Sequence, residues 1–204
     1  MRSATEVFGD WAKDGRDERM AKGHADAVAN MLDFAILNVS DSFTAIDAGC
    51  GNGWAARSVQ ALPACAHAQG VDGAKEMIER ARTIDPDGTY IHADLMEWKP
   101  AEPVDLVHSM EVFYYFRQPG ALLTHIVKHW LKPGGRLIAG VDHYLENPPS
   151  HDWAAQNGIA FMTTLSEAQW LDLCRNAGLG QVQSWRANAR EDWAGTLIFT
   201  GTKR

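Results

Sequence analysis

Residues 45–54 have the sequence Ala45-Ile46-Asp47-Ala48-Gly49-Cys50-Gly51-Asn52-Gly53-Trp54. An apolar run gives way to three glycines at alternate positions, and the small and apolar residues of 55–59 then begin a helical pattern. This pattern predicts a buried strand, a tight loop and a helix, the arrangement that brings backbone amides close to a ligand. A glycine costs about 0.5–1 kcal/mol relative to alanine in a regular element, so the loop indicates unusual backbone conformations or a close approach.

The spacing of the glycines distinguishes between ligand classes. The dinucleotide fingerprint Gly-x-Gly-x-x-Gly/Ala would need a small residue at position 54, which is Trp54. A phosphate-binding loop needs a Gly-Lys-Ser/Thr triplet, and the sequence contains none. Asp47 at the strand end would repel a pyrophosphate but would suit a ligand that carries an ammonium or a sulfonium.

The spacing Asp-x-Gly-x-Gly-x-Gly resembles the first motif of the class I S-adenosylmethionine (SAM) dependent methyltransferases. Further motifs follow in that family's order: Asp72 ends a second predicted strand, 19 residues after Gly53, and Ala93-Asp94-Leu95 and Asp105-Leu106-Val107 come later. The resemblance covers roughly residues 42–204. It implies an α/β fold, a Rossmann-like three-layer sandwich with a seven-stranded, mostly parallel sheet whose last strand is antiparallel.

The N-terminal residues precede the first predicted strand. We expect a single domain in which residues 1–41 form a helical cap and residues 42–204 form the Rossmann-like core. Residues 1–16 show little helical pattern, whereas apolar residues between Asp17 and Leu37 repeat at spacings of three and four. In the resembling family such segments often fold over the cofactor. A packing helix with no ligand contact is an equally open interpretation.

The resemblance implies that the chain binds SAM and its product S-adenosyl-L-homocysteine. Asp72 is expected to accept the ribose hydroxyls, and Asp94 the exocyclic amine of adenine. The full set of implied cofactor-binding residues is Asp47, Gly49, Cys50, Gly51, Gly53, Trp54, Asp72, Gly73, Met77, Ala93, Asp94, Leu95, Ser109, Met110 and Glu111.

Methyl transfer from a sulfonium depends mainly on alignment and on exclusion of water. Where the acceptor must also lose a proton, His143 and Tyr115 are the predicted catalytic residues, since His143 follows the fifth predicted strand near the mouth of the cleft. His24, Tyr114 and Glu111 are further candidates for this role. The sequence shows no spacing typical of metal ligands.

Two proline-containing stretches have structural interpretations. Leu131-Lys132-Pro133-Gly134-Gly135 resembles a family marker in which the proline fixes φ and both glycines adopt positive φ, so that a helix turns back into a strand. Asn147-Pro148-Pro149-Ser150 differs from the Asn-Pro-Pro-Tyr motif of amino-group methyltransferases in its fourth residue and in its position after strand five. We interpret it as a turn.

Composition restricts the partners. The 204 residues carry a net charge of −7, which argues against a nucleic-acid partner. Three widely spaced cysteines fit a reducing compartment, and the sequence has neither an apolar leader nor a run near the ~18 apolar residues of a membrane span. We therefore expect a cytoplasmic location and a small-molecule substrate, with the oligomeric state open.

Three alternatives remain. A dinucleotide-dependent oxidoreductase is disfavoured by Asp47 and Trp54. A SAM-binding module without transferase activity would show the same motifs, because the motifs describe cofactor binding and not the acceptor. A methyltransferase acting on protein or RNA is a third possibility, which the acidic charge makes less favourable.

Overall fold

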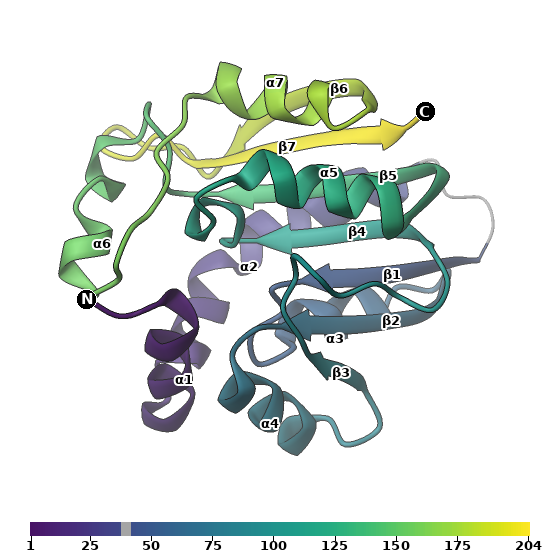
Figure 1. The fold of residues 1–204 in the computed structure, drawn as a ribbon, viewed down its shortest axis with the longest axis horizontal. Coiled ribbons are helices and arrows are strands. Elements are labelled where there is room, and N and C mark those ends of the chain that lie inside the picture. The colour runs from purple at the N-terminus through teal and green to yellow at the C-terminus, as the bar shows by residue number, and fades with distance from the viewer. Residues whose placement is uncertain (38–41) are drawn as a thin grey trace.

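The computed structural model describes residues 1–37 and 42–204. The polar cluster of residues 38–41, where the predicted boundary between cap and core falls, lies outside the described residues. Seven strands of the described chain form one sheet in the order β3-β2-β1-β4-β5-β7-β6 (Figure 1). They are β1 (Phe43–Ala48), β2 (Cys65–Asp72), β3 (Thr89–His92), β4 (Val104–Met110), β5 (Leu131–Val141), β6 (Leu179–Ala187) and β7 (Thr196–Lys203).

The strand directions confirm the predicted fold class. The pairs from β3 to β5 are parallel, and β7 pairs antiparallel with both β5 and β6. The helices are α1 (Ala4–Asp14), α2 (Arg16–Ile36), α3 (Trp54–Gln60), α4 (Lys75–Ile84), α5 (Pro119–His129), α6 (Trp153–Gln156) and α7 (Glu167–Asn176). Two 3-10 turns, η1 (Phe113–Tyr115) and η2 (Pro148–Ser150), complete the described elements.

Helices cover both faces of the sheet. Apolar residues of α5 and α7, among them Leu122, Ile126 and Trp170, pack on one face, which is the near face in Figure 1. Residues of α2 and α3, such as Met31 and Val59, pack on the other. The central strands are buried along nearly their whole length because parallel strands are covered on both sides.

The N-terminal segment is more regular than its sequence pattern indicates. The weakly patterned residues 1–16 contain α1, whose first turn is closed by a capping box between Ser3 and Glu6. The helix predicted for residues 17–37 is confirmed as α2. Gly9 of α1 lies so close to α4 that a Cβ there would be 2.7 Å from a Glu76 carboxylate oxygen. The first helix therefore lies against the edge of the core near α4.

The stretch Leu131–Gly135, predicted as a turn into the fifth strand, is already part of β5, which partly corrects the sequence prediction. Gly134 has the expected positive φ, 78°, whereas Gly135 is not among the glycines with positive φ. Gly135 is needed for space, since a Cβ there would lie 2.9 Å from the Lys132 carbonyl oxygen and 3.0 Å from that of Val104. The stretch Asn147–Ser150 forms the predicted turn, as η2.

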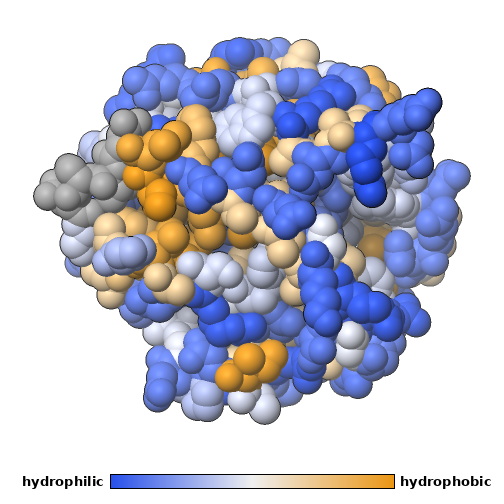
Figure 2. Space-filling view, turned by 180° about the vertical axis from the view of Figure 1, so that it is seen from behind, coloured by the Kyte–Doolittle hydropathy of each residue, from blue (hydrophilic) through white to orange (hydrophobic). Residues whose placement is uncertain are grey.

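The opposite face of the molecule shows mixed hydropathy (Figure 2). A group of apolar side chains is visible there beside the grey residues 38–41, near the end of α2, where Leu37 is 70% exposed. Among the helices of residues 1–37 and 42–204, none combines the length and the apolar character needed to cross a membrane.

Candidate active site

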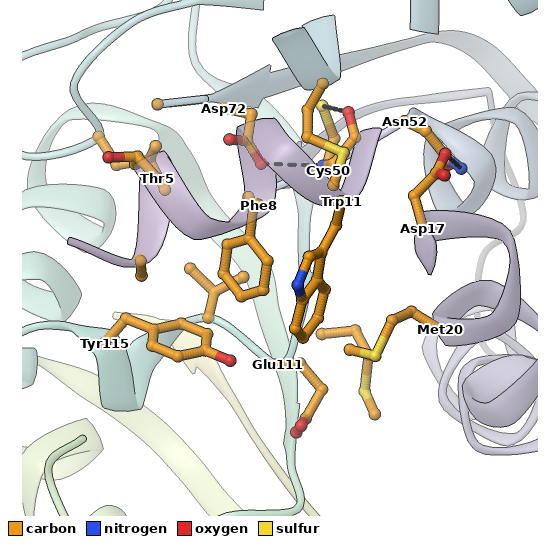
Figure 3. Close-up of a pocket in the computed structure, with 18 of the residues that line it drawn as sticks. Thr5, Phe8, Trp11, Asp17, Met20, Cys50, Asn52, Asp72, Glu111 and Tyr115 are labelled. Carbon is orange, nitrogen blue, oxygen red and sulfur yellow. Dashed lines mark hydrogen bonds between the residues drawn. The ribbon is translucent and has the colours of Figure 1, made fainter. Parts of the chain in front are cut away.

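A cavity of about 570 Å³ lies at the carboxyl ends of β1, β2 and β4, with α1 over it. Strand order reverses between β1 and β4, which is where open α/β sheets bind ligands. Figure 3 shows Phe8 and Trp11 of α1 between two walls of this cavity, one with Asp72 and Cys50 and the other with Glu111 and Tyr115.

Most of the sequence-predicted site residues line this cavity. They are Asp47, Gly49, Cys50, Gly51, Trp54, Asp72, Gly73, Met77, Asp94, Leu95, Met110, Glu111 and Tyr115. Gly53, Ala93, Ser109 and His143 are not among its lining residues. Ser109 is fully buried and its hydroxyl donates to the Ala48 carbonyl, so it joins β4 to β1. The Ala93 amide donates to the Asp72 carbonyl and extends the strand pairing.

The three glycines of the loop are required for different reasons. All have positive φ, between 53° and 78°. A Cβ at Gly49 would collide with Val112, and one at Gly53 with the Tyr90 ring. At Gly51 the nearest atom to such a Cβ is the Met77 sulfur, 4.0 Å away. Gly49 and Gly53 thus allow the chain to pack, whereas Gly51 keeps free a space that faces the cavity.

Asp72 is fixed by the loop that it faces. Its carboxylate accepts hydrogen bonds from the Gly51 amide at 2.9 Å and the Ala74 amide at 2.7 Å. Burial raises the pKa of Asp72, while these two amides act in the opposite direction. Each oxygen keeps further acceptor capacity. The side chain can therefore accept two vicinal hydroxyls without giving up its own hydrogen bonds.

Asp47 has one engaged and one free carboxylate oxygen. Its Oδ1 lies 2.8 Å from Nδ1 of His108, a histidine buried inside β4. Its Oδ2 is buried and has no hydrogen-bond partner within the described chain. A buried carboxylate oxygen without a partner is costly, so this atom at the cavity wall fits a ligand that carries a donor or a positive charge.

The N-terminal segment supplies cavity residues that the predicted cofactor motifs do not contain, among them the candidate base His24. Phe8, Trp11 and Asp17 line the cavity, as do Met20 and His24. The buried Asp17 carboxylate accepts from the Asn52 amide at 2.7 Å and from Arg80 Nε at 2.8 Å, which connects the start of α2 to the glycine loop. The spacing of Ser3 and Glu6 is the sequence signal that would have located α1, although not its place over the cavity.

A cluster of His24, Glu111 and Asp142 lies beside the cavity. His24 Nε2 is 3.2 Å from Asp142 Oδ2 and 3.9 Å from Glu111 Oε2. Burial disfavours the imidazolium, but the hydrogen bond to Asp142 and the charge of Glu111 outweigh it and raise the pKa of His24 to about 9. Burial, together with Asp142, raises the pKa of Glu111 to about 8. Donor atoms of the three lie within 4.8 Å of one another, a separation that would also suit a metal ion.

The two predicted catalytic residues have different surroundings. Tyr115 lines the cavity, and its hydroxyl lies 3.2 Å from that of Tyr114. His143 is 1% exposed, with Nδ1 3.0 Å from the Ser150 carbonyl and Nε2 2.8 Å from the Thr164 hydroxyl. With both ring nitrogens engaged away from the cavity, His143 occupies a packing position, and the geometry gives its predicted role as a base no support.

Comparison with known proteins shows the family of the chain. A family model described as a methyltransferase domain matches residues 13–184. The trans-aconitate 2-methyltransferase of Azoarcus sp. strain BH72 is 31% identical over 176 residues, which are 80% of this chain and 68% of that protein. The chain belongs to the class I SAM-dependent methyltransferases.

Two solved structures share the fold of this methyltransferase. One is a Haloferax volcanii protein described as a methyltransferase and solved in complex with the Trm112 methyltransferase activator, with 30% identity, a TM-score of 0.83 and coverage of 99% of this chain and 98% of that one. The other is the N-methyltransferase NodS of Bradyrhizobium japonicum with bound S-adenosyl-L-homocysteine, with 18% identity, a TM-score of 0.67 and coverage of 88% and 86%. The second shows a likeness of fold alone.

The residues of this methyltransferase fit its cofactor. Gly51 leaves space at the wall, the unpartnered Asp47 Oδ2 suits a cationic group, and Asp72 retains acceptor capacity for the ribose. Asp94, whose Oδ1 accepts from the Met96 amide, lines the same cavity on the β3 side. When bound, SAM supplies an activated methyl group on a sulfonium.

Proposed function

We propose that this methyltransferase transfers the methyl group of SAM to a small-molecule acceptor in an in-line displacement. One observation carries the proposal. The same cavity is lined by the glycine loop and Asp72 and by aromatic side chains of the cap. The loop side provides contacts for the donor, and the α1 side, with Phe8 and Trp11, provides a surface for an acceptor (Figure 3).

The residues of the chain support such a reaction by holding and enclosing the reactants. Asp72 and Gly51 are connected by a hydrogen bond, so they would fix the donor as a unit. Phe8 and Trp11 lie over the cavity and would exclude water from it. Alignment and exclusion of water are the main requirements for transfer from an already activated group.

A small acceptor is favoured over a macromolecule by two observations. The relative in Azoarcus is named for the small molecule trans-aconitate. The cavity is covered by α1, and its volume of about 570 Å³ lies in the ordinary range of small-molecule sites. The net charge of −7 also disfavours an RNA acceptor.

Calorimetry with SAM, S-adenosyl-L-homocysteine and NAD tests the proposal. We expect SAM and its product to bind with a micromolar dissociation constant, about −8 kcal/mol, and NAD to show no heat of binding. Because the Haloferax volcanii protein was solved with an activator, titrations are made with the chain alone and with an added activator of that kind. Binding of NAD without SAM would refute the proposal. SAM binding without turnover over a broad acceptor panel would instead favour the module without transferase activity.

A further inference from the structure

The charged residues that line the cavity are mainly acidic. Asp47, Asp72 and Asp94 lie on the side of the glycine loop, and Asp17 and Glu111 are the other carboxylates. Among residues 1–37 and 42–204, no lysine or arginine lines the cavity, and only His24 and His92 there can carry a positive charge. His24 is already paired with Asp142, and Nε2 of His92 lies 3.2 Å from the Gly73 carbonyl oxygen. An anionic acceptor would therefore lose its hydration without gaining a free cationic partner.

Aromatic rings surround the part of the cavity that the cofactor residues leave to an acceptor. The centroids of Phe8 and Trp11 are 5.1 Å apart at 74°, and those of Phe8 and Tyr115 are 5.1 Å apart at 77°. Figure 3 shows these three rings facing the cavity with Glu111 beside them. All three residues line the cavity, and cationic nitrogen is attracted to any ring face that a neighbouring ring leaves open.

Glu111 is held in place as a fixed carboxylate. Its φ is 61°, a left-handed conformation that is uncommon for residues other than glycine. The Asp142 amide donates to Oε1 at 2.5 Å, and the Tyr114 hydroxyl donates to Oε2 at 2.6 Å. A strained backbone maintained by such contacts is typical of functional positions. The side chain thus faces the cavity in one orientation, next to the rings.

We propose that the acceptor is a small organic amine, bound as its ammonium by the rings of Phe8, Trp11 and Tyr115 and by the carboxylate of Glu111. The proposal rests on the proposed methyl transfer and specifies its acceptor. It separates this methyltransferase from relatives named for trans-aconitate, a tricarboxylate, for which this cavity offers no free basic side chain.

The reaction balances as follows. The bound ammonium gives one proton to Glu111, and the free lone pair of the nitrogen forms a bond to the methyl carbon. The bond between that carbon and sulfur breaks, and its electron pair remains on sulfur, which becomes a neutral thioether. The positive charge ends on the methylated ammonium, and Glu111 releases its proton to solvent. The Asp142 amide and the Tyr114 hydroxyl hold the Glu111 side chain in place for that proton, and a cation bound beside it favours its ionised form.

Binding of an unreactive cation tests the proposal without catalysis. Choline and its neutral counterpart 3,3-dimethyl-1-butanol have similar shapes and differ in charge. With saturating S-adenosyl-L-homocysteine, we expect choline to bind at least tenfold more tightly than the alcohol, and trans-aconitate to show no saturable binding. Phe8→Leu and Glu111→Gln should each reduce the preference for choline about tenfold. Asp26→Asn, which removes an exposed acid on α2 outside the cavity lining, should leave it unchanged.

Three results separate the proposals. Tight S-adenosyl-L-homocysteine binding with equal affinity for choline and the alcohol overturns the amine acceptor and leaves the methyl transfer standing. Absence of S-adenosyl-L-homocysteine binding refutes the methyl transfer itself.

With methyl-labelled SAM, label on phenethylamine and none on trans-aconitate or phenylacetate supports the amine acceptor, and label on the carboxylates alone overturns it. Phe8→Leu leaves the polar cluster intact, so it provides the test should Glu111→Gln fail to fold.

Discussion

At Gly51 a substitution should affect ligand binding more than folding. Its position faces the cavity, and a Cβ would meet no protein atom closer than 4.0 Å. Gly49, two residues earlier, has a similar φ, but a Cβ there would collide with Val112. The same substitution at the two positions should therefore have different consequences.

We expect Gly51→Ala to weaken SAM binding at least tenfold while the protein remains folded. The added methyl group would enter ligand space, and alanine at a φ of 53° costs about 1–3 kcal/mol. Calorimetry measures the affinity, and circular dichroism the thermal midpoint. Gly49→Ala is the comparison, since it should lower the thermal midpoint further through the clash with Val112. Unchanged SAM affinity in a folded Gly51→Ala protein would mean that the loop is only a turn.

Most residues within motifs could be placed at the cavity from sequence, whereas candidates outside them, such as Tyr115 and His143, could be named but not placed. Asp47 and Asp72 lie in the last residues of β1 and β2, and Asp94 comes just after β3. The carboxyl ends of parallel strands meet at one edge, so the convergence of these acids follows from the pattern. His143 also follows a strand, but its ring is engaged by Ser150 and Thr164 instead of facing the cavity. The periodicity of the sequence does not predict in which direction a side chain points once the strand has ended.

Among the elements, the start of α2 is connected to the glycine loop and to α4 by hydrogen bonds of one buried acid. Asp17 is 4% exposed, and it accepts hydrogen bonds from Asn52 and Arg80. Glu18 contacts the same arginine at 2.5 Å, but its side chain is 59% exposed. The two neighbouring acids thus contact the same arginine, one from a buried and one from an exposed position, so their substitutions can be compared directly.

Asp17→Ala should destabilise the protein by about 1–3 kcal/mol, because hydrogen bonds to charged groups contribute about that much and Arg80 loses its buried partner. Hydrogen exchange should increase in α1 and at the start of α2, with the strands β1 and β4 unaffected. Glu18→Ala should cost less than about 1 kcal/mol, as exposed pairs do. Equal effects of the two substitutions, or faster exchange throughout the sheet, would contradict a role of Asp17 in fixing the N-terminal helices.

Elements with strong local patterns were predictable. The apolar run that follows the loop with Pro100 and Pro103 predicts a strand over Val104–Met110, and β4 forms at those bounds. The short α1 has few large apolar residues, and an isolated helix of 11 residues is marginal in water. Its stability comes from tertiary contacts, such as that of Gly9 with α4, which a local pattern cannot contain.

The whole molecule should become less stable as pH rises through the titration of the cluster beside the cavity. His24 has a folded pKa of about 9 against an ordinary 6.5, and Glu111 about 8 against 4.5. Both values are raised, so the folded protein binds more protons than the unfolded chain between about pH 4.5 and 9, and its stability falls with pH in that window.

Thermal melting from pH 6 to 9.5 measures this dependence. The thermal midpoint should decline across the range, and Glu111→Gln should flatten the decline, because the titrating carboxyl is removed while its size is kept. His24→Gln should flatten the part near pH 9. Asp26→Asn changes an exposed acid on the same helix as His24 and should leave the slope as it is. A midpoint that rises from pH 6 to 9.5 would contradict the assignment.

The position of α1 has a consequence for engineering. The rings of Phe8 and Trp11 belong to an 11-residue helix that contributes no strand to the sheet, while the donor contacts belong to loops between strands. In the proposed reaction, part of the acceptor surface and the donor contacts are thus encoded in separate stretches of the gene. Replacing residues 1–14 with the corresponding segment of another methyltransferase is expected to change the acceptor preference, with Tyr115 and Glu111 kept from the host, and to retain the SAM affinity of the host.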